Sequence, residues 1–478
     1  MHARSLISSA LRCRIRRLPS ESSPAIRSLS TAYEQQSPYS SVEVDPAVIA
    51  SYPNGATTVT DAEISIFSEI KPTPVSLRQI LETTDPYEAA QFLHSEFPVR
   101  CAERIRMIES IPTSQWVNVP ELVEAHGRHV LAFWRLRAVS IDSDESRNLD
   151  AFTEAVRDVV HENVDMTLLI TKGMTDLYRT SDEEMIDSAY VDNFLNTFLL
   201  NRLGSNVLLK QYLAVVSPDE FGFGVHNEQT GEGIVDPECD VARLCRETAR
   251  SVGQMCKKET DRIPPPITVE AFSASESDVS HNGMSTSPKF SFIPPALGYI
   301  LRELLKNSCR ATVDACRALP HGEVRRRPVS VTVSADDARM MICVADRGGG
   351  IPFDRMDNVW SYLHSTTRKK WEDDRSVADD DADHDGIVST GLPLSGNEDN
   401  NPTELAGYGI GLPMSRLYAR YLGGDLNLIS LPGYGTHAYV FLPRLSSDQI
   451  ETFPEQHRQG FQGDCNAQSG GHKPDFVL

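Results

Sequence analysis

Residues 407–426 read GYGIGLPMSRLYARYLGGDL, and this stretch decides the fold of the second half of the chain. Gly407, Gly409 and Gly411 lead into a helix with Pro413 near its first turn, where helices accommodate proline best. Glycines ahead of a helix N-terminus leave backbone amides and a partial positive charge free for phosphate. The stretch follows an acidic segment and lacks the GK[ST] ending, which excludes a Rossmann fingerprint and a P-loop.

A second motif, ELLKNSCRATVDA at residues 303–315, places Glu303, Asn307 and Arg310 on one helical face. The amide oxygen of Asn307 suits Mg²⁺, which takes a few protein oxygens beside phosphate and water. A carboxylate one turn earlier can deprotonate a hydroxyl as a general base. Taken alone, the motif is more often an exposed polar helix face. Its meaning therefore depends on the motifs that follow it.

Two glycine turns complete the set. ADRGGGI at residues 345–351 follows the apolar run MMICV, so Asp346 stands at a strand end with glycines that let a ligand approach the backbone. A carboxylate there can accept a hydrogen bond from the exocyclic amine of adenine. GYGTHAYVFLP at residues 433–443 is a turn into a closing strand that offers the hydroxyl of Thr436. The order of the four motifs is more specific than any one of them.

Periodicity predicts two domains and an α+β fold. Apolar residues three and four apart run through residues 77–215 and predict an antiparallel bundle of about four helices, placed at residues 65–220. The second domain, at residues 235–446, is predicted to be an α/β sandwich with a mixed sheet. Its strand signals are the alternating β-branched runs, and they lie at 329–334, 340–344, 425–430 and 438–442. A lid with an acidic insertion is expected at 364–405 and a tail at 447–478.

The ends and the charge of the chain limit where it works and what it binds. Residues 1–30 are rich in Arg and Ser with Glu21 as the only acid, which is typical of a mitochondrial transit peptide and predicts the matrix. The formal net charge of −21 argues against general affinity for nucleic acid or anionic membranes. No apolar run approaches the roughly 20 residues of a spanning helix. We therefore expect no nucleic-acid partner and no membrane span.

The four ordered motifs resemble the GHKL ATPases, the superfamily of gyrase, MutL and the histidine kinases. ELLKN, DRGGG, the lid start SYLHSTT at 361–367 and GLPMSRLYARYLGGDL look more specifically like the mitochondrial kinases of the pyruvate and branched-chain 2-oxo acid dehydrogenase complexes. FPVR at 97–100, NRLG at 201–204 and GIVDPECDV at 233–241 extend the resemblance through the helical domain. It covers residues 65 to 445.

This resemblance implies ATP-dependent phosphorylation of a serine on the decarboxylating subunit of such a complex, which switches the complex off. It implies that Glu303 is the general base and that Asn307 is the Mg²⁺ ligand. It implies a homodimer whose partners are that subunit and the lipoyl domains of the acyltransferase core. The ATP contacts that it implies are Glu303, Asn307, Arg310, Asp346, Gly348, Gly350, Ser365, Thr366, Gly407, Tyr408, Gly409, Ile410, Gly411, Leu412 and Thr436.

Departures from the family pattern leave the substrate open. Tyr299 stands one turn before Glu303, where pyruvate dehydrogenase kinases commonly have histidine, and this resembles the branched-chain kinase. GIVDPECDV and the glycine helix start look more like the pyruvate enzymes, so pyruvate dehydrogenase is the favoured substrate. Two further alternatives are a histidine autokinase that uses His161 and a non-catalytic scaffold, and the intact Glu303, Asn307 and Asp346 argue against the scaffold. The tail lacks the Asp-Trp pair that links subunits in many relatives.

Overall fold

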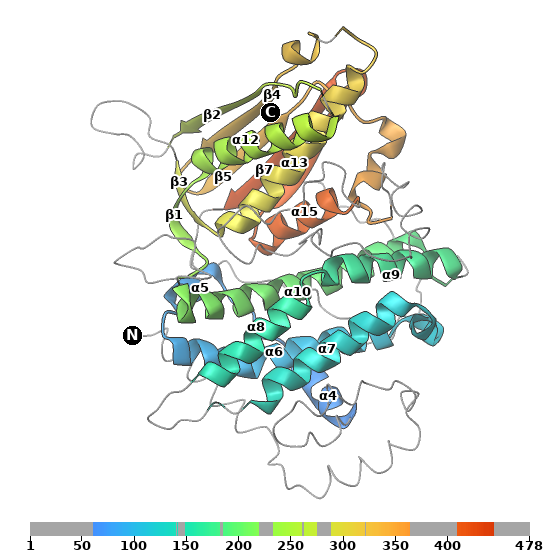
Figure 1. Ribbon diagram of the computed structural model, residues 1–478, viewed down its shortest axis with the longest axis vertical. Coiled ribbons are helices and arrows are strands. Elements are labelled where there is room, and N and C mark those ends of the chain that lie inside the picture. Colours follow the sequence, from blue (N-terminus) through green and yellow to red (C-terminus); the bar gives the residue numbers. More distant parts are fainter. Residues whose placement is uncertain are drawn as a thin grey trace, which may run out of the picture.

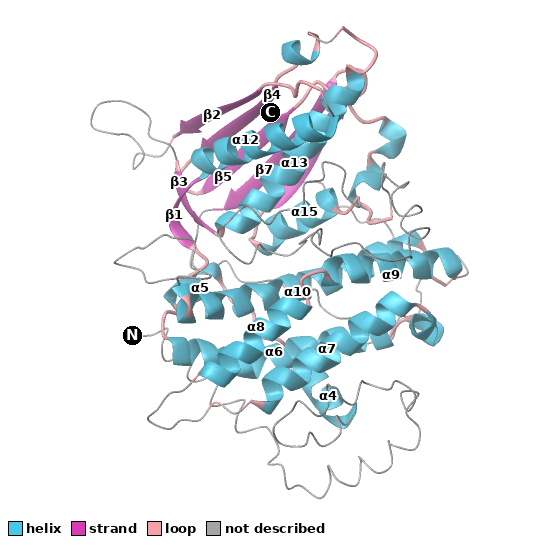
Figure 2. Cartoon of the chain, viewed as in Figure 1, coloured by secondary structure: helices cyan, strands magenta, loops and turns pink. Residues whose placement is uncertain are grey.

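The computed structural model describes residues 61–139, 141, 149–181, 185–218, 233–260, 262–274, 288–320, 322–363 and 409–443. Within these ranges the chain forms a helical part and a part that combines a sheet with helices (Figure 1). Figure 2 shows that the strands are confined to the second part. The α+β class expected from the sequence is therefore confirmed. None of the helices in these ranges is both long enough and apolar enough to cross a membrane.

The helical part consists of long helices that lie side by side. Their bounds, with those of two shorter helices, are α4 Asp61–Ser68, α5 Leu77–Glu82, α6 Pro86–Glu109, α7 Pro120–Ala138, α8 Asp150–Glu162, α9 Met166–Thr180 and α10 Ser188–Val216. Helix α6 packs against α7 and α10, and α9 packs against α7. The helical domain predicted for this half of the chain is present.

Local sequence explains where the principal helices begin. The side chain of Asp85 accepts hydrogen bonds from the backbone N–H groups at the start of α6, and Pro86 occupies the first helical turn. Asp187 caps α10 in the same way. A buried polar contact then ties the two helices together, because Arg104 of α6 donates to Asn201 and, at 2.7 Å, to Ser205 Oγ of α10. This contact fixes the register of α6 against α10.

The second part is a five-stranded sheet in the order β2-β4-β5-β7-β6. Strands β2 and β4 are parallel and the other neighbours are antiparallel, so the sheet is mixed as predicted. The bounds are β1 Asp236–Asp240, α12 Val241–Thr260, β2 Ile267–Ser273, β3 Lys289–Phe292, α13 Pro294–Ala315, β4 Val329–Ala335, β5 Arg339–Ala345, α15 Gly411–Tyr421, β6 Asp425–Leu431 and β7 Gly435–Pro443. β1 and β3 form a separate antiparallel pair.

The four strands predicted from alternation are β4, β5, β6 and β7. Helix α13 begins at the pair Pro294 and Pro295. Strands β1, β2 and β3 were not predicted from the sequence. Strand β2 has a weak signal, ITVEAFS, in which only Ile267, Val269 and Ala271 pack against the core. The side chains between them, such as Thr268 and Glu270, are exposed, so the strand has a single short apolar face.

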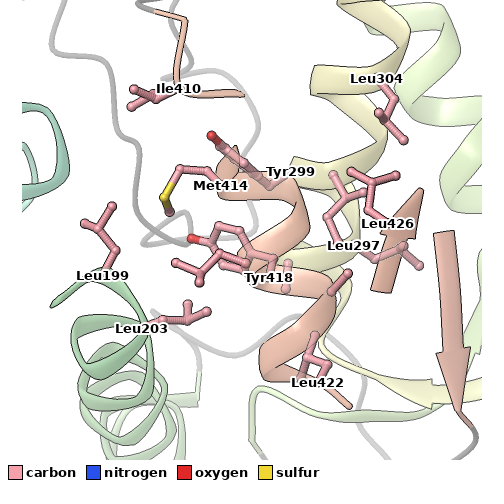
Figure 3. Packing of buried hydrophobic residues seen from close by; sticks show 14 of the residues in the cluster. Leu199, Leu203, Leu297, Tyr299, Leu304, Ile410, Met414, Tyr418, Leu422 and Leu426 are labelled. Atoms are coloured by element: carbon pink, nitrogen blue, oxygen red, sulfur yellow. The ribbon is translucent and has the colours of Figure 1, made fainter. Parts of the chain in front are cut away.

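Helices α12, α13 and α15 cover one face of the sheet (Figure 1). Helix α15 also contacts α10, and this contact joins the two parts into one continuous core. Figure 3 shows the junction, where Tyr418 of α15 lies between Leu199 and Leu203 of α10 and the side chains of α13. Helix α15 is therefore packed directly onto the helical part, and α13 packs against α15.

Candidate active site

One face of helix α13 carries several polar groups of the candidate site, some of them buried. Glu303 accepts a hydrogen bond from Lys306 Nζ at 3.0 Å, and both side chains are largely buried. Asn307, the next residue, is exposed. Arg310 lies one turn further, 3.8 Å from Asp314. The helix thus presents a carboxylate held by an ammonium group, followed by an amide and a guanidinium group.

Asp346 lies where β5 ends, 6% exposed. Its Oδ2 accepts from Ser308 Oγ of α13 at 3.0 Å. Its Oδ1 accepts from the backbone N–H groups of Gly348 at 2.8 Å and Thr436 at 3.2 Å. Burial raises the pKa of the Asp346 carboxyl above its ordinary value, although these hydrogen bonds favour the charged form and act against the rise. The arrangement fixes both carboxylate oxygens in place.

The glycine turns after β5 allow close backbone packing. Gly349 and Gly350 have φ values of +91° and +72°, which glycine adopts without strain. A side chain at Gly350 would collide with the backbone of Leu431. The turn is tied to the one before β7, because Gly433 N–H donates to the Gly349 carbonyl at 2.7 Å. The two turns predicted from separate motifs therefore form one wall of the site.

The start of α15 meets the proposed catalytic carboxylate. A Cβ atom at Gly411, the first residue of α15, would overlap Glu303 Oε2. Position 409 also favours glycine, because its φ is +85°. The side chain of Ile410 is buried in the core, as Figure 3 shows, and Leu412 is partly buried against it. The backbone of Ile410, rather than its buried side chain, is therefore available to a ligand.

Tyr299 lies one helical turn before Glu303 and is buried against Tyr418, with 5.0 Å between the ring centroids. Burial, and secondarily the charge of Glu303, raises the pKa of Tyr299 well above its ordinary value. The phenol therefore stays neutral across the physiological range. It cannot serve as a group that gains or loses a proton near neutral pH.

The structure brings most of the predicted residues together. Those within the described residues lie on α13, at the two glycine turns and at the start of α15. They are Glu303, Asn307, Arg310, Asp346, Gly348, Gly350, Gly409, Ile410, Gly411, Leu412 and Thr436. The other predicted contacts, which are Ser365, Thr366, Gly407 and Tyr408, fall outside the described residues.

Two hydroxyl groups of the site were missed in the sequence analysis. Ser308 holds Asp346, and Ser430 contacts Thr436 Oγ1 at 2.9 Å and the backbone N–H of Ile351 at 2.7 Å. Ser308 had a detectable signal, because it stands four residues from both Leu304 and Thr312 and so shares the buried face of the helix. A serine at such a position needs a hydrogen-bond partner. No comparable signal marks Ser430.

Comparison with known proteins defines the class of the second domain. Residues 293–446 match the family model described as "Histidine kinase-, DNA gyrase B-, and HSP90-like ATPase". This range contains α13, both glycine turns and α15, so the candidate site lies within the matched domain. Residues 74–236 match a second model, described as "Mitochondrial branched-chain alpha-ketoacid dehydrogenase kinase".

Curated relatives narrow the class to a family. A mitochondrial [pyruvate dehydrogenase (acetyl-transferring)] kinase of Arabidopsis thaliana is 30% identical over 80% of this chain and 93% of its own length. Isozyme 4 of the human kinase is 28% identical over 86% of this chain and 90% of its own length. The chain therefore belongs to the family of mitochondrial pyruvate dehydrogenase and branched-chain 2-oxo acid dehydrogenase kinases.

Proposed function

We propose that this protein is an ATP-dependent serine kinase that phosphorylates and inactivates the decarboxylating subunit of the pyruvate dehydrogenase complex. The relatives named above are pyruvate dehydrogenase kinases, which supports pyruvate dehydrogenase as the substrate over the branched-chain enzyme. The nucleotide-binding domain supports ATP as the phosphoryl donor. The matrix is the proposed location, in keeping with the mitochondrial relatives and the Arg-rich N-terminus.

One observation carries the proposal most directly. A single helix, α13, supports both ends of the nucleotide site, because Ser308 holds Asp346 and Glu303 lies against Gly411 at the start of α15. The rise of an α-helix separates Glu303 from Ser308 by roughly 7.5 Å along the axis. We assign adenine to the Asp346 end, and the reacting phosphate and the serine to the Glu303 end. Thr436, Gly348 and Gly350 lie at the adenine end.

The proposed reaction is in-line transfer of the γ-phosphoryl group. The serine oxygen attacks the γ-phosphorus, the bond to the β–γ bridging oxygen breaks, and ADP leaves. Glu303 accepts the hydroxyl proton, and the ammonium group of Lys306 keeps its carboxylate oriented. The backbone N–H groups at the start of α15, with Gly409, Ile410, Gly411 and Leu412, face the phosphates.

Mg²⁺ fits the exposed amide of Asn307, because the side-chain oxygen lies on the same helix as the base and is free of the buried Glu303–Lys306 pair. The ion neutralises phosphate charge when it is bound. Asn307 and Arg310 then act as fixed groups on the phosphate side. Ser365, Thr366, Gly407 and Tyr408 complete the proposed ATP contacts, and lipoyl domains and a second copy of the chain are the proposed further partners.

The test is phosphate transfer from labelled ATP to the purified decarboxylating subunits of the pyruvate and branched-chain complexes, assayed side by side. We expect acid-stable phosphoserine on the pyruvate subunit. Glu303→Gln removes the base and should lower the rate by about 10²-fold or more. Glu154→Gln is the matched control, because Glu154 lies exposed on α8, far from the site in the sequence, and should leave the rate unchanged.

Three results would contradict the proposal. Full activity in the Glu303→Gln variant would remove the assigned base. Preferential phosphorylation of the branched-chain subunit would reassign the substrate. Acid-labile phosphate on His161, an exposed residue of α8, would indicate a histidine autokinase instead.

A further inference from the structure

A groove lies between α12 and the edge strand β2. Strand β2 is at the opposite edge of the sheet from β6 and β7, against which α15 packs. Its volume is about 650 Å³. Its floor is formed by Ile267 and Val269 of β2 and by Pro264 and Pro265. Its wall is one side of α12, where the small residues Ala249 and Gly253 leave room for the groove.

The wall carries three exposed cations, Arg246, Arg250 and Lys257, at positions that repeat along one side of the helix. None of them forms an ion pair with any residue that the structure describes. Arg243, one turn before Arg246 on the same side of α12 but not among the residues that line the groove, is instead paired with Glu247 at 2.8 Å. A row of three cations that have no ion-pair partner among the described residues favours an anionic occupant, although the chain has a net charge of −21.

The floor offers free backbone groups. Val329 N–H donates to the Pro266 carbonyl and Ala274 N–H donates to the Ala335 carbonyl, so even-numbered residues of this segment face β4. The backbone N–H and C=O groups of successive residues point to opposite sides of a strand. Those of Ile267, Val269 and Ala271 therefore face the open edge of the sheet. No described residue pairs with them there.

We propose that this groove binds an acidic, extended segment of a partner protein, which adds to β2 as a further strand. The backbone of the segment pairs with Ile267, Val269 and Ala271, and its carboxylates contact Arg246, Arg250 and Lys257. Strand addition provides affinity through the main chain, and the cationic stripe selects acidic side chains. This docking site is separate from the nucleotide site and does not depend on the proposed reaction.

The occupant follows from geometry and charge together. A nucleic acid or an anionic membrane would meet the cations but would leave the strand edge unpaired. A small anion would occupy one end of the stripe, because Arg246 and Lys257 are separated by roughly 16 Å along the helix axis. A strand of about five residues spans that distance.

The experiment measures fluorescence anisotropy of a labelled peptide, in which Glu and Val alternate over about eight residues, on the full-length protein. We expect saturable binding that weakens with salt. The double variant Arg246→Ser with Arg250→Ser should lose about tenfold or more in affinity. The control Lys258→Ser removes an exposed cation from another side of α12, outside the groove lining, and should leave affinity nearly unchanged.

The strand component has its own test. Val269→Pro removes one outward N–H group, and edge strands tolerate proline at such positions. It should lower affinity without changing the charge, and thermal unfolding of the variant confirms that it is folded. A peptide in which Glu and Pro alternate has the same charge and should bind about tenfold more weakly. Absence of binding by the Glu/Val peptide, equal binding of the Glu/Pro peptide, or equal binding of a DNA oligonucleotide would overturn the proposal.

Discussion

Asp192 of the helical part accepts two hydrogen bonds from residues just before the predicted lid, from Ser361 Oγ at 3.0 Å and from Tyr362 N–H at 2.9 Å. Tyr362 is buried, and its hydroxyl donates to Asn196 Oδ1 at 3.0 Å. Asp192 and Asn196 lie one turn apart on α10, so this helix holds the segment of Ser361 and Tyr362, which precedes the predicted lid, at two places. The position of the helical part is thereby coupled to the nucleotide domain.

The variant Asp192→Ala should weaken this junction. It leaves the buried N–H of Tyr362 and the hydroxyl of Ser361 without their acceptor, which costs about 1–3 kcal/mol for each buried group. We expect a lower unfolding free energy in urea and a higher KM for ATP. Tyr362→Phe removes only the bond to Asn196 and should cost about 1 kcal/mol.

The control for this prediction is Asp158→Ala. Asp158 is exposed and lies 3.7 Å from Arg135, and such surface pairs contribute about 0–1 kcal/mol. If Asp192→Ala proved as stable as Asp158→Ala and bound ATP normally, the coupling between α10 and the segment of Ser361 and Tyr362 would be refuted.

Asp346→Asn should abolish ATP binding without lowering the free energy of unfolding at neutral pH. Burial raises the pKa of the carboxyl, so the native state binds its proton more readily than the unfolded state does. The unfolding free energy therefore falls as pH rises from the ordinary pKa through the native pKa, and the charged form is the less favourable one in the fold. A neutral amide keeps the accepting Oδ1, so we expect equal or higher stability at neutral pH with loss of Mg-ATP binding by calorimetry. Retained ATP binding would exclude Asp346 as the adenine contact.

Ser308→Ala should shift the pH dependence of ATP binding. The Ser308 hydrogen bond lowers the pKa of Asp346, so its removal raises that pKa further. ATP affinity should then begin to fall at a higher pH on acidification, because a protonated carboxyl is a weaker acceptor for the adenine amine than a carboxylate is. Affinity at neutral pH should drop about tenfold, the usual effect of one hydrogen bond to a charged group. Identical profiles for both proteins would refute this role of Ser308.

Gly411→Ala tests the contact between the start of α15 and the proposed base. The added Cβ overlaps Glu303 Oε2, so the carboxylate must move away from its position. Transfer to serine should fall by about tenfold or more, with a smaller change in ATP affinity. Gly298→Ala on α13 is the matched control, since a Cβ there meets no atom within 4 Å.

The control variant Gly298→Ala should keep its activity and gain stability. Alanine in place of glycine in a helix interior raises stability by roughly 0.5–1 kcal/mol, so Gly298→Ala should be active and more stable. Equal activity of the Gly411→Ala and Gly298→Ala variants would show that the close approach at Gly411 has no catalytic consequence.

Tyr299→His should add an ionisation to the pH profile of kcat/KM. The pKa of Tyr299 is raised well above its ordinary value by burial and by Glu303, so the native residue stays neutral throughout the assay range. Histidine titrates near pH 6.5 in the absence of perturbation, within reach of the base one turn away. Tyr299→Phe should leave the profile unchanged. The same profile in the histidine variant and the native protein would show that this position does not influence the reaction.

Much of the fold followed from local sequence. The Pro294–Pro295 pair starts α13, and alternation in β4 to β7 matches their buried faces, because helix starts and strand faces depend on neighbouring residues in the chain. The residue types of the site were also recognisable, since a carboxylate, an amide and glycines in this order suit a nucleotide. Strand β2 was missed because its apolar signal is short and half exposed.

The sequence by itself thus determined the two-part α+β plan and the family, and it predicted the residues that are proposed to carry the chemistry. Only the tertiary structure decided which of those residues meet. Ser308 reaches Asp346 across 38 positions of sequence, and Asp192 reaches Tyr362 across 170. Such contacts depend on how α13 packs on the sheet and how α10 packs on α15, and the side chains that make them have no shared local pattern. The cationic groove beside β2 appears for the same reason, because a helix stripe and a strand edge become one surface only after packing.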